Sequence, residues 1–134
     1  MSESRPETLG QMIEHAKQHV QTLPAERVAA EIEAGGVLLI DVREEDERLL
    51  EGSLPNAIHV PRGMLELSAD PASPLYRQEF NPEGRLILYC SSGSRSALGA
   101  YTLLQMGYEN VADLEGGMMA WKREGYPVEM VGFG

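Results

Sequence analysis

The chain has 134 residues, 43% of them hydrophobic, and a formal net charge of −10 from 11 Lys and Arg against 21 Asp and Glu. This size fits one compact domain, and the acidic balance argues against nucleic acid or acidic membranes as partners, because phosphate binding needs clustered Lys and Arg. No apolar run reaches the roughly 20 residues of a membrane span. With a single cysteine in addition, we expect a cytoplasmic protein in a reducing compartment.

Helices and strands alternate along the predicted order of elements. The expected elements are, in chain order, an amphipathic helix after Thr8, a helix from about Pro24, a strand over 37–41, an acidic helix to about Glu51, a strand over 57–60, a short helix through Met64, a strand over 86–89, a helix over 96–106, a strand over 110–114 and a helix over 118–124. Such alternation predicts an α/β fold, an open parallel sheet flanked by helices on both faces. We assign residues 1–27 to an N-terminal helical extension and 28–132 to the main domain.

The segment from Ser68 to Arg85 contains three prolines and Gly84 and is predicted to be mostly loop. Long loops in compact domains are often functional. If this loop folds over a site, five residues could line it, although simple packing is the alternative for them. These residues are Arg62, Met64, Leu65, Tyr76 and Phe80.

Cys90 lies where an apolar strand meets a loop of small residues that opens a helix. The loop backbone can curl around the sulfur and aim N–H groups at it, and the helix dipole adds positive potential. Both effects predict a lowered thiol pKa, and thus a nucleophile that needs no histidine. A buried structural cysteine is the alternative. The expected active-site loop is Ser91, Ser92, Gly93, Ser94, Arg95 and Ser96.

Three charged residues are candidates for a supporting role around this loop. Asp41 ends a strand on the same rim as Cys90, and we expect Arg43 to pair with Glu44 or Glu47 and hold adjacent loops in place. Arg95 has two open roles: contact with an anionic substrate, which we favour, or an ion pair with a carboxylate such as Asp41.

The remaining polar candidates have simpler interpretations. The acidic run over 44–47 suits the solvated first turn of a helix. His59 is expected to be a satisfied strand-end histidine. His15 and His19 have i, i+4 spacing, but two ligands make a poor metal site, so we expect neither a metal nor a cofactor.

The order of these motifs resembles the rhodanese, or sulfurtransferase, family from about Val28 to Met130. One departure is Gly-Ser-Leu-Pro-Asn-Ala over 52–57, where the family often has Gly-His-Ile-Pro-Gly-Ala. The segments that carry the resemblance are LIDVRE (39–44), PNAIHVPRG (55–63), LYCSSGSRSA (88–97), MGY (106–108) and LEGGMMAW (114–121).

The resemblance implies a single-domain rhodanese fold in which Cys90 carries sulfur. Its thiolate would attack the outer sulfur of thiosulfate or of a low-molecular-weight persulfide and form a Cys90 persulfide, which a second nucleophile then consumes. Cyanide, a thiol such as glutathione, and a protein thiol such as that of a thioredoxin-like protein are the acceptors implied. Both intermediates are anions, so no proton relay is required. Arg62 is a further supporting residue, and either a monomer or a homodimer is compatible with the sequence.

Two other functions compete with sulfur transfer. Cysteine-dependent phosphatases and arsenate-reductase-like enzymes also use a cysteine-headed anion loop, but they carry five residues between Cys and Arg, whereas four separate Cys90 from Arg95. A noncatalytic rhodanese-like docking module is the second alternative, and retention of Cys90, Gly93 and Arg95 argues against it.

Overall fold

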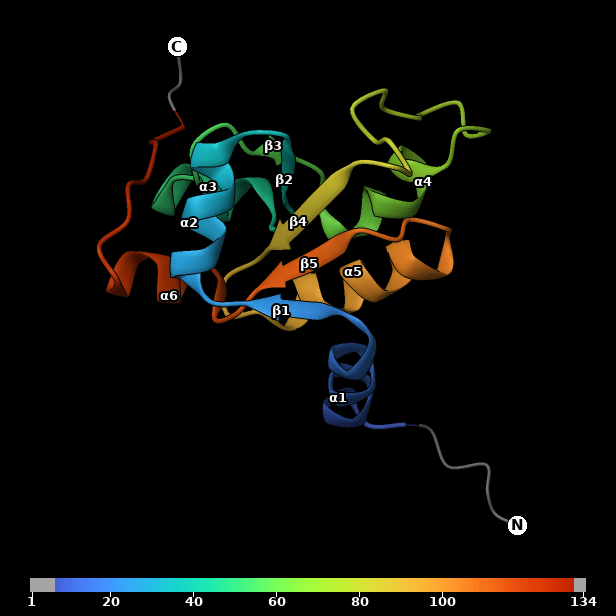
Figure 1. Cartoon of the computed structure of the whole chain (residues 1–134), viewed down its shortest axis with the longest axis horizontal. Coiled ribbons are helices and arrows are strands. Elements are labelled where there is room, and N and C mark those ends of the chain that lie inside the picture. Colours follow the sequence, from blue (N-terminus) through green and yellow to red (C-terminus); the bar gives the residue numbers. More distant parts are fainter. Residues whose placement is uncertain (1–6, 132–134) are drawn as a thin grey trace.

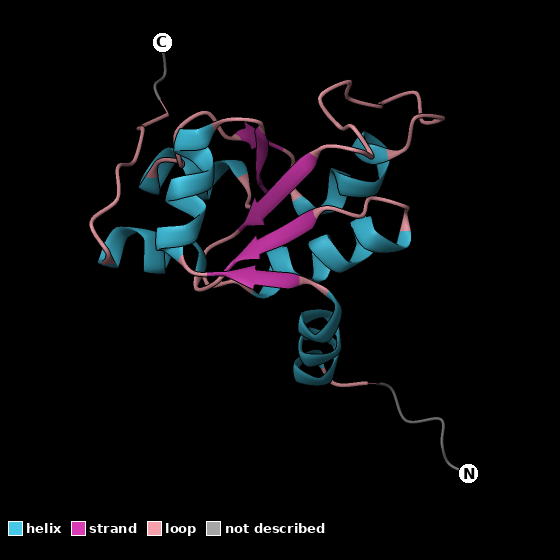
Figure 2. Cartoon of the chain, in the orientation of Figure 1, coloured by secondary structure: helices cyan, strands magenta, loops and turns pink. Residues whose placement is uncertain are grey.

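The computed structural model describes residues 7–131 and confirms the α/β fold, with helices on both faces of one parallel sheet (Figures 1 and 2). The sheet order is β1-β5-β4-β2-β3. The strands are β1 (Gln21–Leu23), β2 (Val37–Asp41), β3 (Ile58–His59), β4 (Arg85–Tyr89) and β5 (Val111–Leu114). The helices are α1 (Leu9–His19), α2 (Ala25–Ala34), α3 (Glu45–Glu51), a 3₁₀ turn (Arg62–Met64), α4 (Leu65–Ala69), α5 (Ser94–Gln105) and α6 (Gly117–Arg123).

The sheet separates two hydrophobic clusters, one under α1, α4 and α5 and the other under α2 and α6 (Figure 1). Strand β4 contributes to both, because successive side chains of a strand point to opposite faces. Leu86, Leu88 and Cys90 belong to the first cluster, and Ile87 and Tyr89 to the second. The sulfur of Cys90 therefore lies on the α5 side of the sheet.

Strand β1 was not predicted from the sequence. It has three residues, too few for a period-2 pattern, and it pairs in parallel with β5 at the edge of the sheet. Helix α1 begins after Thr8, as predicted, with a capping box in which Thr8 and Gln11 bond to each other's backbone N–H groups. Its buried Ala16 and the following Val20 face the domain. The segment assigned to an extension thus contributes an edge strand and a packed helix.

The long loop enters β4 at the amino end of that strand, whereas Cys90 follows its carboxyl end (Figure 1). Leu65 and Phe80 are buried in the first cluster. The Tyr76 hydroxyl donates to the Phe80 carbonyl, which fixes the loop against the core. These three residues therefore pack the domain.

Asn56 explains one departure from the family pattern. Its φ is +65°, a left-handed conformation that Gly or Asn adopts more readily than other residues. The family's usual glycine and the asparagine of this chain therefore satisfy the same turn.

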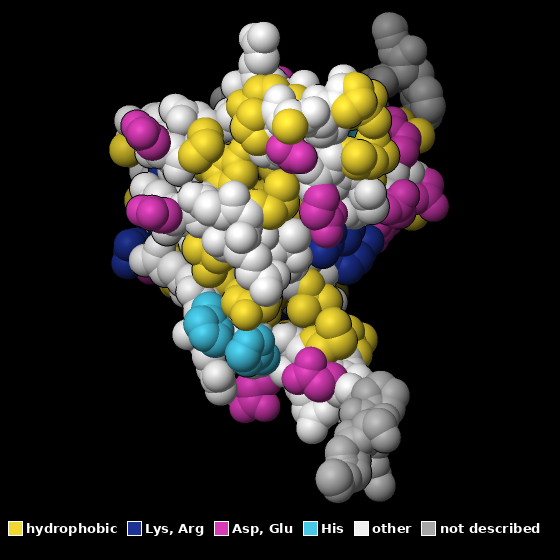
Figure 3. Space-filling view, turned by 90° about the vertical axis from the view of Figure 1, so that its right-hand side faces the viewer, with side chains coloured by type: hydrophobic (Ala, Val, Ile, Leu, Met, Phe, Trp, Pro, Cys, Tyr) yellow, Lys and Arg dark blue, Asp and Glu magenta, His cyan; other side chains and the backbone are white. Residues whose placement is uncertain are grey.

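On the side of the domain shown in Figure 3, hydrophobic side chains lie mostly in the upper part of the view, and two histidine side chains lie side by side below them. His15 and His19 have ring centroids 4.7 Å apart, and His15 Nε2 lies 3.1 Å from the Tyr101 hydroxyl oxygen. In the described range 7–131, no helix combines the length and the apolar character that crossing a membrane requires.

Candidate functional site

The candidate site forms where β4 ends and α5 begins. Cys90 directly follows β4, and Gly93, with φ of +108°, precedes the first helical residue Ser94. Helix α5 starts two residues earlier than predicted, because this left-handed glycine turns the chain into the helix immediately. Cys90 and Ser96 are fully buried, whereas Ser92 is exposed and Ser91 and Ser94 are half-buried.

Two backbone N–H groups and one hydroxyl oxygen lie close to the sulfur of Cys90. The Gly93 N–H lies 3.1 Å from Sγ, and the Ser96 N–H lies 3.4 Å from it. The Ser96 Oγ also lies 3.4 Å from Sγ. Peptide N–H groups in this arrangement form a nest that stabilises a negative charge on sulfur. The predicted loop thus encloses Sγ mainly through Gly93 and Ser96.

The start of α6 holds the outer side of the same loop. Met118 N–H donates to the Cys90 carbonyl at 2.8 Å, and Met119 N–H donates to the Ser91 carbonyl at 3.1 Å. A Cβ atom on Gly117 would lie 2.3 Å from the Cys90 carbonyl oxygen, so only glycine permits this approach. Because α6 binds these carbonyls, the loop can turn its N–H groups toward the sulfur.

Arg95 forms a bidentate ion pair with Glu47 of α3, at 2.8 and 2.9 Å. The carboxylate that it binds is therefore not Asp41. The Arg95 guanidinium holds the pKa of Glu47 at about 2. Glu47 was expected to be solvated, because an acidic run gives no sign in the sequence of which member turns toward a distant arginine.

Asp41 and Arg43 are completely buried and bind each other. Arg43 also donates to Glu51 and to the Gly52 carbonyl. This corrects the expected pairing with Glu44 or Glu47: α3 places Glu51, one turn beyond Glu47, over the guanidinium. The Tyr89 hydroxyl donates to Asp41 Oδ2, and burial is the main reason that the pKa of Tyr89 is raised.

This buried network lies on the face of the sheet opposite Sγ, because Tyr89 and Cys90 are successive residues of an extended segment. Its function in the structure is to fix the end of β2 against α3. Asp41 and Arg43 therefore stabilise the segments next to the site from the opposite face of the sheet.

Arg62 and His59 bind elements other than the Cys90 loop. Arg62 donates to Glu66 and to the Thr102 hydroxyl, which ties the 3₁₀ turn to α4 and α5. His59 Nε2 lies 2.7 Å from the Arg43 carbonyl oxygen, so this histidine is satisfied at the strand end.

Sequence analysis missed Asp113, a buried acid of β5. The Ser96 hydroxyl, whose oxygen faces Cys90 Sγ, donates to Asp113 Oδ1. The other carboxyl oxygen, Oδ2, is buried and has no hydrogen-bond partner among residues 7–131. Burial raises the pKa of Asp113 to about 7. A lone Asp in an apolar strand was the available signal, but nothing in the sequence joined it to Ser96.

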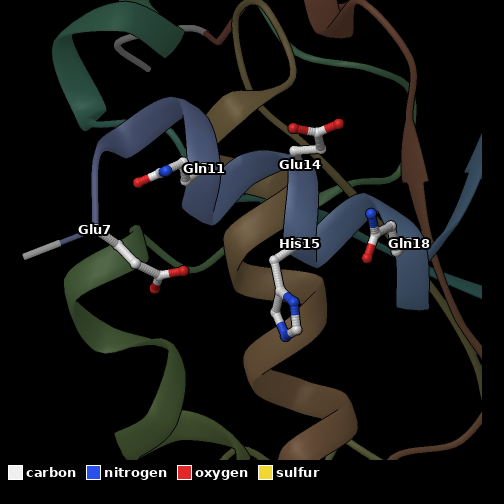
Figure 4. Close-up of a pocket in the computed structure, with 5 residues that line it drawn as sticks. All are labelled: Glu7, Gln11, Glu14, His15 and Gln18. Atoms are coloured by element: carbon white, nitrogen blue, oxygen red, sulfur yellow. The ribbon is translucent and has the colours of Figure 1, made fainter. Parts of the chain in front are cut away.

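A polar hollow lies along α1, separate from the cysteine loop (Figure 4). The Glu7 side chain extends from the segment before α1 and the His15 side chain from α1 itself, and none of the lining residues belongs to the loop after β4. Within the described chain, no group of three His, Cys, Asp or Glu side chains is placed to hold a metal ion. The lining residues are Glu7, Gln11, Glu14, His15 and Gln18.

Comparison with known proteins finds proteins that are similar to most of this chain. The profile of the rhodanese-like domain matches residues 24–124. A protein named "Sulfurtransferase" from Allochromatium vinosum is 34% identical over 92 residues, which are 69% of this chain and 78% of that protein.

Two solved structures share the fold and more than 30% of the sequence. One is a Rhodopseudomonas palustris protein of unknown function described as a possible tyrosine phosphatase, with a TM-score of 0.89, 34% identity, and coverage of 96% of this chain and 99% of that one. The other is a thiosulfate sulfurtransferase from Pseudomonas aeruginosa, with a TM-score of 0.73, 31% identity, and coverage of 90% of this chain but 22% of that one.

Proposed function

Because the chain belongs to the rhodanese-like domain family, we propose that it is a sulfurtransferase in which Cys90 carries sulfane sulfur as a persulfide. The observation that supports this proposal most is the pair of backbone N–H donors on Cys90 Sγ, those of Gly93 and Ser96. These donors stabilise an anion on sulfur.

The proposed cycle has two steps. In the first, the Cys90 thiolate attacks the outer sulfur of thiosulfate, an S–S bond forms to Sγ, and the donor's own S–S bond breaks and releases sulfite. In the second, an acceptor such as cyanide attacks the outer sulfur of the persulfide, and the bonding electrons return to Sγ. Both forms of Cys90 are anions, so the same donors serve each step.

Complete burial of Cys90 favours small donors. A low-molecular-weight persulfide or thiosulfate presents a terminal sulfur that is small enough for such a site. Glutathione or a thioredoxin-like protein thiol is the acceptor class we propose, and a cytoplasmic, reducing compartment would supply it.

A cysteine-dependent phosphatase is the second candidate, because a relative of nearly the same length is described as a possible tyrosine phosphatase. Two observations disfavour it here. Only four residues separate Cys90 from Arg95, and both terminal nitrogens of Arg95 bind Glu47, so a phosphoryl group would compete with this carboxylate for the guanidinium.

Parallel assays decide between the two activities. We expect sulfite release from thiosulfate with cyanide as acceptor, no hydrolysis of an aryl phosphate, and loss of sulfite release in Cys90→Ala. Phosphatase turnover that disappears in Cys90→Ala would overturn the proposal. Correct folding of that variant is checked by its circular dichroism and unfolding midpoint.

A further inference from the structure

The buried acid beside the active-site loop has no part in the cycle described above. Asp113 is fully buried in β5, and it accepts a hydrogen bond from the Ser96 hydroxyl. The same hydroxyl oxygen lies 3.4 Å from Cys90 Sγ. The Cys90 sulfur, the Ser96 hydroxyl and the Asp113 carboxyl therefore lie in a continuous series inside the protein. The thiol and the carboxyl can each lose a proton.

We propose that Asp113, acting through the Ser96 hydroxyl, takes up the proton that Cys90 gives up, so that the two side chains share a single negative charge. Asp113 is then a positioning residue for the nucleophile. The inference rests on the proposed function only in that Cys90 is the reacting group.

The proton transfer balances within these three residues. The S–H proton moves to Ser96 Oγ, and the hydroxyl proton that faced Asp113 moves to Asp113 Oδ1. The products are a Cys90 thiolate, a Ser96 hydroxyl that now donates to Sγ, and a neutral Asp113 carboxyl that donates to Ser96 Oγ. No charge enters or leaves the site, so the transfer avoids creating a second buried anion.

The surroundings of Asp113 support this role. Burial is the largest influence on its carboxyl and raises its pKa to about 7, so a proton is already easy to place there near neutrality. A neighbouring thiolate raises that affinity further, because two close anions repel. Among residues 7–131 only the Ser96 hydroxyl donates to the Asp113 carboxyl, and Oδ2 has no donor, so a buried carboxylate here is incompletely compensated.

Few other charged groups lie near the Cys90, Ser96 and Asp113 side chains. Lys17 of α1 favours the Asp113 carboxylate, and Glu115 beyond β5 opposes it. The neighbours of Asp113 in sheet register, Thr22 of β1 and Leu88 of β4, do not titrate. On the Cys90 side, Arg95 carries the nearby positive charge, and it interacts with both Glu47 and Cys90.

Residue-specific titration tests the inference without any enzyme assay. The carboxyl ¹³C signal of Asp113 is followed by NMR from pH 4 to 10 in the wild-type chain and in Cys90→Ala. Removal of the thiolate should lower the Asp113 titration midpoint by at least about one pH unit, the effect of one close charge in a partly shielded site. An unchanged midpoint would overturn the inference, whether or not the protein transfers sulfur.

The reciprocal experiment follows Cys90 through its rate of alkylation by iodoacetamide over the same pH range. Coupled groups titrate in two steps, and removing one leaves the other with one step. We expect two steps in the wild type and in Asp70→Asn, a control substitution on the loop after α4, and a single step in Asp113→Asn. Two unchanged steps in Asp113→Asn would contradict the shared proton.

Discussion

Arg95 in the first turn of α5 is bound through both terminal nitrogens to the carboxylate of Glu47 in α3. The pair ties the helix that follows the Cys90 loop to the helix that follows β2. The pair uses one N–H group on each terminal nitrogen of the guanidinium. The loop is thus fixed by side-chain and backbone contacts, while the donors on Sγ come from Gly93 and Ser96.

The Arg95–Glu47 pair should stabilise the fold in a pH-dependent way. Glu47 has a pKa of about 2 in the folded protein, below its ordinary value of 4.5. Its contribution is therefore complete above about pH 4.5 and declines as the pH falls toward 2. Since both side chains are partly exposed, we expect Glu47→Gln to cost no more than about 1 kcal/mol at pH 7.

Urea unfolding at pH 7 and at pH 3 checks this sign. The difference in unfolding free energy between the wild type and Glu47→Gln should shrink at pH 3. A difference that grows on acidification would show that the ion pair does not account for the effect.

Asp113 should have the opposite pH dependence. Its folded pKa of about 7 lies above the ordinary value of 3.8, so the folded state holds the proton more tightly. Stability is then highest below about pH 4, falls as the pH rises to about 7, and levels off above it. At about 1.4 kcal/mol for each pKa unit between 3.8 and about 7, the loss is on the order of 4 kcal/mol.

Asp113→Asn removes this titration, and thermal or urea unfolding across pH 4 to 8 measures it. We expect the variant to gain stability relative to the wild type as the pH rises from 4 to 7. A constant difference between the two proteins would refute the assignment of the buried carboxyl as the titrating group.

The sequence predicted those elements well that are long or that are bounded by proline or glycine. Strand β2 was placed from its apolar run, and the start of α2 from Pro24. Strand β1 was not predicted, because three residues show no periodicity and because its partner β5 lies far along the sequence.

The candidate site was predictable only in its local part. Cys90 and its loop are contiguous in the sequence, so the small residues and the start of the following helix indicate them. The partners that complete the site, Glu47 for Arg95 and Asp113 for Ser96, lie 48 and 17 residues away. A single sequence contains no signal for such pairs, and Arg43 was assigned the wrong glutamate for the same reason.

Gly117→Ala should lower the free energy of unfolding by more than the strain of a positive φ alone would cause. Gly117 and Gly125 both have positive φ, but a Cβ on Gly117 would lie 2.3 Å from the Cys90 carbonyl oxygen, whereas a Cβ on Gly125 meets nothing within 4 Å. We expect Gly125→Ala to cost about 1 kcal/mol from strain alone, and Gly117→Ala to cost about 2 kcal/mol more. Chemical unfolding of both variants provides the comparison, and equal losses would show that α6 does not clamp the loop.

The Tyr89 hydroxyl bridges a buried network, since it donates to Asp41 Oδ2 and accepts from Leu54 N–H. Tyr89→Phe leaves both partners buried without this bond and should lower the free energy of unfolding by about 1–3 kcal/mol. The matched control is Tyr101→Phe, whose hydroxyl bonds to His15 at the surface and should matter by less than about 0.5 kcal/mol. Similar losses in the two variants would contradict a special role for the Asp41 network.

Mass spectrometry of the intact protein after exposure to thiosulfate tests the central claim most directly. A Cys90 persulfide adds about 32 Da, and a thiol reductant removes it. We predict that this addition appears in the wild type, maps to the peptide that contains Cys90, and is absent from Cys90→Ser. An unchanged mass after exposure to both thiosulfate and glutathione persulfide, with Cys90 reduced and open to alkylation, would contradict sulfur carriage by this residue.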